Sequence, residues 1–254
     1  QGNPAPRLHA TGSGMINAVG LQGRGTAHWV QHDLPRLRAR GARVVASIWG
    51  FRESEYEQAA LDLAAIADQL VAVEVNLSCP NVDHARGMFA HSAVQSAQVI
   101  AAVRRVLPAT VGVWAKLSPN TDQLVPIAGA VVAAGADALV LVNTVLGMAI
   151  DIDTRRPVLG NGGGGLSGAA MHAVAVRSVF DVRAAHRNVP IVGAGGVSNA
   201  DDALELMMAG ADAVQVGTAT FADPRAVAKI QRKMFRWAQR QGITSWGEII
   251  NSAH

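Results

Sequence analysis

Short apolar runs rich in β-branched residues recur along the chain, and a stretch with helical periodicity follows most of them. The six runs occupy residues 43–48, 71–77, 111–117, 138–144, 190–196 and 213–219. Segments between them, such as EYEQAALDLAAIADQL, carry apolar residues at helical spacing with charges on the other face. This alternation predicts parallel strands joined by crossover helices, which is an α/β fold.

A short internal repeat supports the same prediction. The sequence AGADA occurs at residues 134–138 and again at 209–213, each time between a predicted helix and a predicted strand. A glycine at this position ends a helix in a left-handed turn, after which the chain enters the sheet. We therefore expect two equivalent helix-to-strand joints.

The residues at the strand ends distinguish two kinds of α/β fold. Asn76, Lys116, Asn143 and Thr144 lie at the C-terminal ends of three of the runs, and glycines lie at the ends of the last two, near residues 195 and 217. Functional groups at many strand ends, with a phosphate site after the last two strands, are typical of a (β/α)8 TIM barrel. A doubly wound sheet would place its glycine-rich loop after the first strand. The pattern favours a barrel of which about six βα units are present.

The first 25 residues show neither strand nor helix periodicity, and their Pro, Gly and Asn content predicts a long loop. A barrel with six visible strands needs two more. We therefore expect residues 1–254 to form a single barrel domain that lacks roughly its first two strands.

Composition narrows the functional classes. The net charge is only +3, and the densest basic group is typical of a solvated helix face rather than a nucleic-acid surface (Lys229, Arg232, Lys233, Arg236 and Arg240). The single cysteine excludes an internal disulfide and a cysteine-ligated iron–sulfur cluster within the chain. No apolar run reaches the ~20 residues of a membrane span, and no metal-ligand motif stands out. A cytoplasmic protein is expected.

Glycine-rich segments point to a phosphate. GNGGGGLSG at 160–168 lacks the flanking strand of a nucleotide-binding motif, so we expect a flexible loop close to a ligand. GAGGVSNADD at 193–202 and VGTATFADP at 216–224 each place glycine between a strand and a helix. Backbone N–H groups at such turns bind anions, which predicts a phosphate site there.

Two further residues, Cys79 and Lys116, each have two possible roles. Cys79 lies in a small polar stretch directly after a strand, which favours a chemical role, although a free cysteine is more often a small buried hydrophobe. Lys116 at a strand end could neutralise an anionic cofactor or substrate, or could lie in solvent at the rim.

Taken together, the chain resembles the dihydroorotate dehydrogenases, flavin enzymes of pyrimidine biosynthesis built on a (β/α)8 barrel. The matching segments run in order along nearly the whole chain: GNPAPR, GMINAVGLQ, VNLSCPN, WAKLSP, LVNT, GGGLSG, VGAGGVSNADDALE and AVQVGTATFADP. The forms GMINAVGLQ and GGGGLSG look most like the class 1 catalytic subunit, of the NAD-linked type.

The resemblance implies an oxidoreductase that converts dihydroorotate to orotate, with Cys79 as the catalytic base. Its substrate-binding residues match Asn17, Asn76, Asn81, Asn143 and Thr144. Its FMN-binding residues match Lys116, Val142, Gly168, Gly195, Gly196, Gly217 and Thr218. Some family positions differ here, such as Gly23 in GLQGRG and Ala90, and a further family lysine belongs to a strand upstream of the sequence, so no role is carried to those positions.

The resemblance also implies a homodimer, or a heterotetramer with an electron-transfer subunit that carries FAD and an iron–sulfur cluster and reduces NAD⁺. Fumarate or another soluble acceptor is an alternative. Two other functions stay open: an FMN barrel oxidoreductase acting on a different dihydropyrimidine, and a truncated barrel that binds no flavin.

Overall fold

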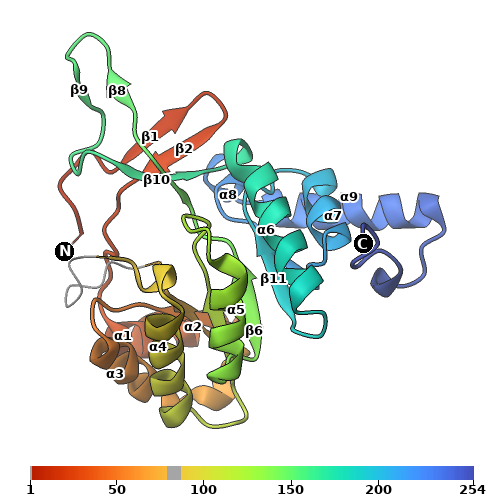
Figure 1. The fold of residues 1–254 in the computed structure, drawn as a ribbon, viewed down its shortest axis with the longest axis horizontal. Coiled ribbons are helices and arrows are strands. Elements are labelled where there is room, and N and C mark those ends of the chain that lie inside the picture. Colours follow the sequence, from red (N-terminus) through yellow and green to blue (C-terminus); the bar gives the residue numbers. More distant parts are fainter. Residues whose placement is uncertain (1, 79–86) are drawn as a thin grey trace. The chain divides into compact units, whose positions relative to one another are not determined.

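The computed structural model describes residues 2–78 and 87–254 (Figure 1). The chain divides into two compact units. Unit 1 comprises Gln1–Gln22 and Leu141–His254, and unit 2 comprises Gly23–Val140. That all 254 residues form one domain stays a prediction.

Unit 2 is built on parallel strands. β3 (Val45–Ile48), β4 (Ala72–Asn76), β5 (Gly112–Lys116) and the start of β6 (Ala138–Leu141) pair in the order β6-β5-β4-β3. Side chains of the central strands, such as Val73 and Val113, are fully buried. Strands buried on both faces read as continuous apolar runs, which is why the sequence revealed them.

Helices follow the strands of unit 2. α3 (Glu53–Ala64), α4 (Ala93–Val106) and α5 (Leu124–Ala133) come after β3, β4 and β5, and α4 packs between the other two. Short helical pieces complete the unit: α1 (Thr26–His28), a π-helical turn (Trp29–Asp33), α2 (Leu34–Arg38), and 3-10 turns at Ala67–Gln69 and Phe89–His91.

Unit 1 holds the last two parallel strands, β11 (Ile191–Ala194) and β12 (Ala213–Gln215). α6 (His172–Ala185) precedes β11, α7 (Ala200–Met208) connects it to β12, and α8 (Ala219–Ala222) and α9 (Ala226–Gln241) follow. 3-10 turns lie at Ala169–Met171 and Trp246–Glu248. Asn199 caps α7 by accepting the N–H groups of Asp201 and Asp202.

A second, antiparallel sheet in unit 1 corrects the predicted N-terminal loop. β1 (Leu8–Thr11) pairs with β2 (Gly14–Asn17), and β10 (Gly164–Ser167) lies between β2 and β7 (Val145–Gly147). The loop predictions for 1–25 and 160–168 are therefore wrong in part. These strands have short runs, glycines and exposed β1 side chains, so no buried alternation marks them.

A ribbon extends from this sheet. β8 (Ile150–Asp151) and β9 (Arg156–Pro157) form an antiparallel hairpin between β7 and β10 (Figure 1). Beneath it, Ala149 and Val158 pack against a small buried cluster of Ile16, Ala18 and Leu159.

The predicted helix-to-strand joints are confirmed. Gly135 and Gly210, the glycines of the two AGADA segments, have φ of 104° and 120°, a region that L side chains rarely adopt. The chain then enters β6 and β12 respectively.

Each joint is fastened by the same set of contacts. Arg104 donates to Asp137 in the first joint and Arg183 to Asp212 in the second, at 3.2 and 2.6 Å. The same carboxylate oxygens accept the N–H groups of Val113 and Ile191, at 2.7 and 2.8 Å. We call this set of contacts the Arg–Asp joint. It links helix, turn and strand in both units.

The fold class is confirmed: an α/β chain with six βα units of a (β/α)8 barrel, four in unit 2 and two in unit 1 by their parallel strands. None of its described helices combines the length and apolarity that crossing a bilayer requires.

Candidate active site

Two predicted site residues lie at adjacent strand ends in unit 2. Asn76 ends β4 and is in register with Lys116, which ends β5. Neighbouring residues in register across a parallel pair project to the same face, so the amide and the ammonium share one side of the sheet. Cys79 and Asn81 lie outside the described residues, and their predicted roles stay predictions.

Lys116 has an acidic neighbour that sequence reasoning missed. Its Nζ lies 3.3 Å from Oε1 of Glu74, and that carboxylate also accepts the Ser47 hydroxyl at 3.1 Å. Glu74 is buried and the Lys116 side chain is one-fifth exposed. Lys116 is thus held within a polar row across β3, β4 and β5, which excludes the solvated rim lysine as its environment.

Asn76 is positioned through both its backbone and its side chain. The hydroxyl of the fully buried Tyr56 donates to the Asn76 carbonyl at 2.7 Å, and the Asn76 Oδ1 accepts the N–H of Ser78 at 3.2 Å. The end of β4 is therefore fixed to α3 immediately before residue 79.

In unit 1, Asn17 and Thr144 meet at a glycine. The Asn17 Nδ2 donates to the carbonyl of Gly165 at 3.2 Å, across the β2–β10 pair. The Thr144 side chain lies directly over the Cα of Gly165, where a Cβ would collide with its hydroxyl. Gly165 is thus required because Asn17 and Thr144, two predicted substrate-binding residues, pack closely against it.

Val142 and Asn143 continue from β6 along β11. Val142 donates its N–H to the carbonyl of Ala194 at 2.7 Å, and the Asn143 Oδ1 accepts the N–H of Thr144 at 2.7 Å. These contacts set the backbone of 142–144 beside the turn that follows β11.

That turn contains Gly195 and Gly196, with φ of 144° and 71°. A side chain at either position would enter α6: a Cβ at 195 would lie 2.5 Å from Cβ of Ala175, and one at 196 would lie 2.6 Å from Cβ of His172. Both glycines are therefore needed for close packing of this turn on the first turn of α6.

The turn after β12 supplies a second set of backbone donors. Gly217 has open space where a Cβ would be, and Thr218 lies close to Gly168, since its Cγ2 is 3.5 Å from a Cβ built there. Within the described part of the chain, Gly195, Gly196, Gly217 and Thr218 donate their N–H groups to no other residue. Unused N–H groups of this kind fit an anionic ligand.

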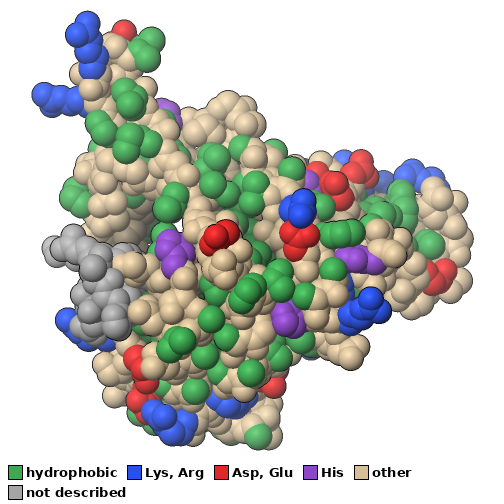
Figure 2. All heavy atoms as spheres, in the orientation of Figure 1, with side chains coloured by type: hydrophobic (Ala, Val, Ile, Leu, Met, Phe, Trp, Pro, Cys, Tyr) green, Lys and Arg blue, Asp and Glu red, His purple; other side chains and the backbone are tan. Residues whose placement is uncertain are grey.

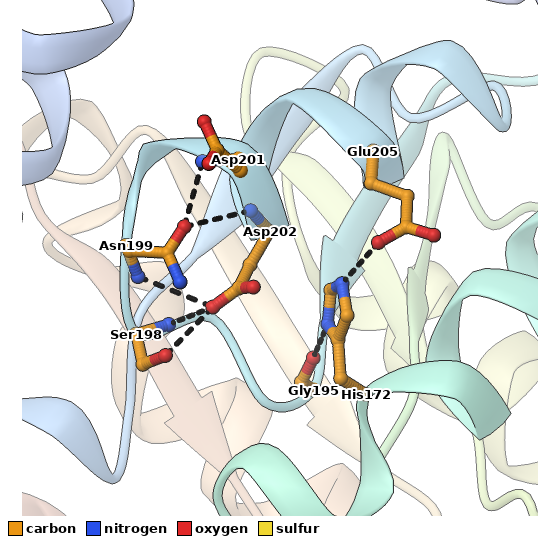
Figure 3. A network of polar contacts seen from close by, with 7 residues as sticks. All are labelled: His172, Gly195, Ser198, Asn199, Asp201, Asp202 and Glu205. Atoms are coloured by element: carbon orange, nitrogen blue, oxygen red, sulfur yellow. Dashed lines mark hydrogen bonds and ion pairs between the residues drawn. The ribbon is translucent and has the colours of Figure 1, made fainter.

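A histidine anchors the first of these turns (Figure 3). His172 Nδ1 lies 2.8 Å from the carbonyl of Gly195, and its Nε2 lies 3.1 Å from a carboxylate oxygen of Glu205. Both partners are oxygen acceptors, so the ring lies between a backbone carbonyl and a carboxylate. The ring connects the start of α6, the turn after β11 and the body of α7.

The same network contains a shifted carboxyl group. Burial raises the pKa of Asp202, but other interactions outweigh this effect and hold the pKa below its usual range. They are hydrogen bonds from the hydroxyl and N–H of Ser198, the charge of His172, and a hydrogen bond from the N–H of Asn199. Asp202 thereby stays ionised and fixes the turn at 198–199 (Figure 3).

Sequence reasoning missed Glu74, Tyr56 and His172. Glu74 carried a signal, because it is a charged residue within an apolar strand and on the same face as Asn76, two positions later. Tyr56 and His172 carried none, because each lies in an ordinary amphipathic helix and acts through contacts distant in sequence.

Comparison with known proteins gives one consistent family. The family model described as dihydroorotate dehydrogenase matches residues 1–237. The chain is similar to proteins named dihydroorotate dehydrogenase B (NAD(+)), catalytic subunit, from Listeria monocytogenes serotype 4a, Trichlorobacter lovleyi and Desulforamulus reducens, with 44% identity to each.

These alignments cover 98%, 99% and 100% of this chain, and 80%, 81% and 82% of the respective relatives. With the family model matching most of the sequence, this chain belongs to the dihydroorotate dehydrogenase family.

Proposed function

We propose that this chain uses FMN to oxidise dihydroorotate to orotate, with Cys79 as the base that takes the proton. Dihydroorotate oxidation in pyrimidine biosynthesis is the activity of the family to which the chain belongs, and that family is flavin-dependent. The choice of FMN, the roles of individual residues and the electron acceptor are the proposed part.

The observation that carries the cofactor proposal is the pair of glycine turns in unit 1. Gly195 and Gly196 follow one strand, Gly217 and Thr218 follow the next, and their N–H groups have no partner among the described residues. A terminal phosphate accepts several such donors at once. These residues, with Gly168, would hold the phosphate of FMN, which matches the site expected after the last two strands of a barrel.

Lys116 and Val142 are proposed to contact the flavin ring system. The Lys116 ammonium is oriented by Glu74 at 3.3 Å, so its charge is held in place before any ligand arrives. FMN, when bound, supplies a hydride acceptor. A fixed ammonium near such an acceptor favours the electron-rich form that hydride transfer produces.

The asparagines are proposed to bind the substrate ring. Dihydroorotate offers amide N–H and C=O groups and a carboxylate, and an asparagine amide can both donate and accept. Asn17, Asn76 and Asn143 are each oriented by a hydrogen bond to or from backbone, at 3.2, 3.2 and 2.7 Å. Asn81 and Thr144 complete the proposed set.

Cys79 is proposed to remove the proton. Oxidation takes a proton from one ring carbon and a hydride from its neighbour, leaving a C=C bond. A thiolate accepts the proton while the flavin accepts the hydride, so atoms and electrons balance. The ordinary thiol pKa of about 8.5 makes mildly alkaline conditions favourable.

The reduced flavin must pass its electrons on. The similar proteins are named catalytic subunits of NAD(+)-linked enzymes. We propose the corresponding arrangement here: an electron-transfer subunit with FAD and an iron–sulfur cluster, NAD⁺ as final acceptor, and a cytoplasmic location.

The test is flavin reduction in a single turnover. The chain is mixed with FMN, a flavin spectrum is recorded, and dihydroorotate is expected to bleach it. Cys79→Ala should keep the flavin spectrum and slow bleaching by about 10²–10⁴-fold, because a positioned base is lost. Cys79→Ser should fall between the two, because its hydroxyl is of similar size but seldom loses its proton near neutral pH.

An unchanged bleaching rate in Cys79→Ala would remove the thiol from the mechanism. A chain that takes up FMN but is not bleached by dihydroorotate, while another dihydropyrimidine does bleach it, would contradict the substrate. A chain that takes up no FMN would contradict the cofactor.

A further inference from the structure

Glu74 is the only buried acidic residue in the part of the chain that the structure describes. Its side chain is 7% exposed, and the strand that carries it, β4, is otherwise apolar up to Asn76. Figure 2 shows Asp and Glu side chains on the outer surface of the molecule, which is their usual place. A carboxylate inside a sheet is unfavourable unless a partner compensates its charge, so Glu74 requires one.

The partner is the ammonium group of Lys116. One oxygen of the carboxylate, Oε1 of Glu74, lies 3.3 Å from Nζ of Lys116 and accepts the Ser47 hydroxyl at 3.1 Å. The lysine side chain is 20% exposed, against 7% for the glutamate. The lysine is thus the member of the pair that a ligand can reach more readily, and the glutamate lies behind it.

A carboxylate at this position does more than orient the lysine. A neutral amide oxygen would accept the same two hydrogen bonds and would hold the ammonium group in the same place. The carboxylate adds a full negative charge, which acts strongly here because the effective dielectric constant of partly buried surroundings is low. Lys116 therefore presents to a ligand the field of a compensated cation, which is weaker than that of a lysine alone.

We propose that Glu74 is a positioning residue that lowers the reduction potential of the bound flavin, by limiting how strongly Lys116 stabilises the reduced form. The inference rests on the proposed function, in which Lys116 contacts the flavin ring system. Uptake of a hydride adds two electrons and one proton, so a neutral flavin gains a negative charge, and a nearby cation stabilises that state. An uncompensated lysine would hold the electrons more firmly and impede their passage to the next acceptor.

The reduction potential of the FMN-loaded chain tests this inference, measured by equilibration with a reference dye. Glu74→Gln should move the equilibrium about tenfold towards reduced flavin, which is about 30 mV for a two-electron couple, because a negative charge beside Lys116 is lost. Glu74→Asp keeps the charge and should stay within about twofold of the wild-type equilibrium. Glu57→Gln is the matched control, because it removes the same charge from the exposed pair with Arg105 and should leave the potential unchanged.

The two half-reactions distinguish this electrostatic role from a purely structural one. In Glu74→Gln, dihydroorotate should bleach the flavin faster and dichlorophenolindophenol should reoxidise it more slowly, because the reduced form is favoured. A substitution that merely loosened the end of β4 would slow both steps. In a Lys116→Met background, Glu74→Gln should shift the potential much less, because the lysine through which the carboxylate acts is absent.

Glutamine has the shape of glutamate, and its amide oxygen can still accept from Ser47 and Lys116, so Glu74→Gln is expected to fold, as circular dichroism can verify. If it does not fold, Glu74→Asp still tests the proposal, because a shift of about tenfold in that variant would contradict a role of the charge. An unchanged potential in FMN-loaded Glu74→Gln, or an equal shift in the Lys116→Met background, would overturn the inference and leave the proposed function standing. A wild-type chain that takes up no FMN would overturn both.

Discussion

A carboxylate and an ammonium face each other across β4 and β5, and both belong to the face that carries Asn76. A buried ion pair contributes little net stability, because desolvation offsets its attraction. Removing one member is costly, however, since the other charge is left behind. We therefore infer that Glu74 compensates the charge of Lys116 at this partly buried strand end and fixes the position of the ammonium group.

Glu74→Gln is expected to lower the free energy of unfolding by about 2 kcal/mol, a value below that of a fully buried pair because Lys116 keeps some contact with solvent. Denaturant unfolding measures it. Glu57→Gln is the matched control, because Glu57 pairs with the exposed Arg105 at 2.8 Å and such surface pairs contribute at most about 1 kcal/mol. An equal decrease in the free energy of unfolding in the two variants would contradict a structural role for the Glu74–Lys116 pair.

At the scale of elements, the most regular feature is the Arg–Asp joint, which recurs after α5 and α7 with the same partners. The two copies differ in burial: the Arg183 side chain is 6% exposed and that of Arg104 is 22% exposed. Each arginine also donates to three backbone carbonyls, so burial is what distinguishes the two joints. These are the carbonyls of Gly210, Arg187 and Val189 for Arg183, and of Leu107, Pro108 and Val111 for Arg104. The joint in unit 1 is thus the more enclosed of the two.

Arg183→Ala should therefore destabilise the protein by about 3–5 kcal/mol, since several acceptors lose their donor within a buried setting. Arg104→Ala should lower the free energy of unfolding by only about 1–2 kcal/mol, because water can reach the partners of Arg104. Thermal and denaturant unfolding compare the two. Arg177→Ala, which removes an exposed pair with Asp181 on α6, is the control and should change stability by about 0.5 kcal/mol or less. A larger loss from Arg104 than from Arg183 would refute this ranking.

For the molecule as a whole, several carboxyl groups have pKa values below their usual range, and acid should affect them together. Hydrogen bonding to Lys229 holds the pKa of Asp223 at about 2. The Thr154 N–H lowers the pKa of Asp151, and the Thr244 hydroxyl lowers that of Glu248. Asp202 is lowered by its hydrogen bonds in the α7 cap, against the effect of burial.

A carboxyl group with a depressed pKa in the folded state contributes stability above its unfolded value, near 4, and loses it as pH falls through the folded value. The melting temperature should be nearly flat above about pH 5 and fall between about pH 4 and 2. Asp223→Asn should make that fall shallower, whereas Asp68→Asn, at an exposed carboxyl group without a described hydrogen bond, should not. A melting temperature that rises towards pH 3 would contradict the assigned direction.

Much of the fold and part of the candidate site could be predicted from the sequence. All six parallel strands and the glycine turns after β11 and β12 were predicted because buried strands read as apolar runs and turn glycines are local. The β1–β2 and β8–β9 hairpins were not, because their strands are short and their exposed side chains follow no polar alternation. The contacts of Lys116 with Glu74, and of His172 with Gly195, depend on residues brought together only by folding.

The Arg–Asp joint has one more consequence, which concerns folding cooperativity. Each joint fastens a helix to a strand within its own compact unit, so its loss weakens that unit directly. Arg104→Ala and Arg183→Ala are therefore paired reporters, one in each unit. If both substitutions shift the same unfolding transition, the two units melt as one cooperative body. If each shifts a transition of its own, the chain unfolds in two steps, and a ligand that binds one unit would protect only that step.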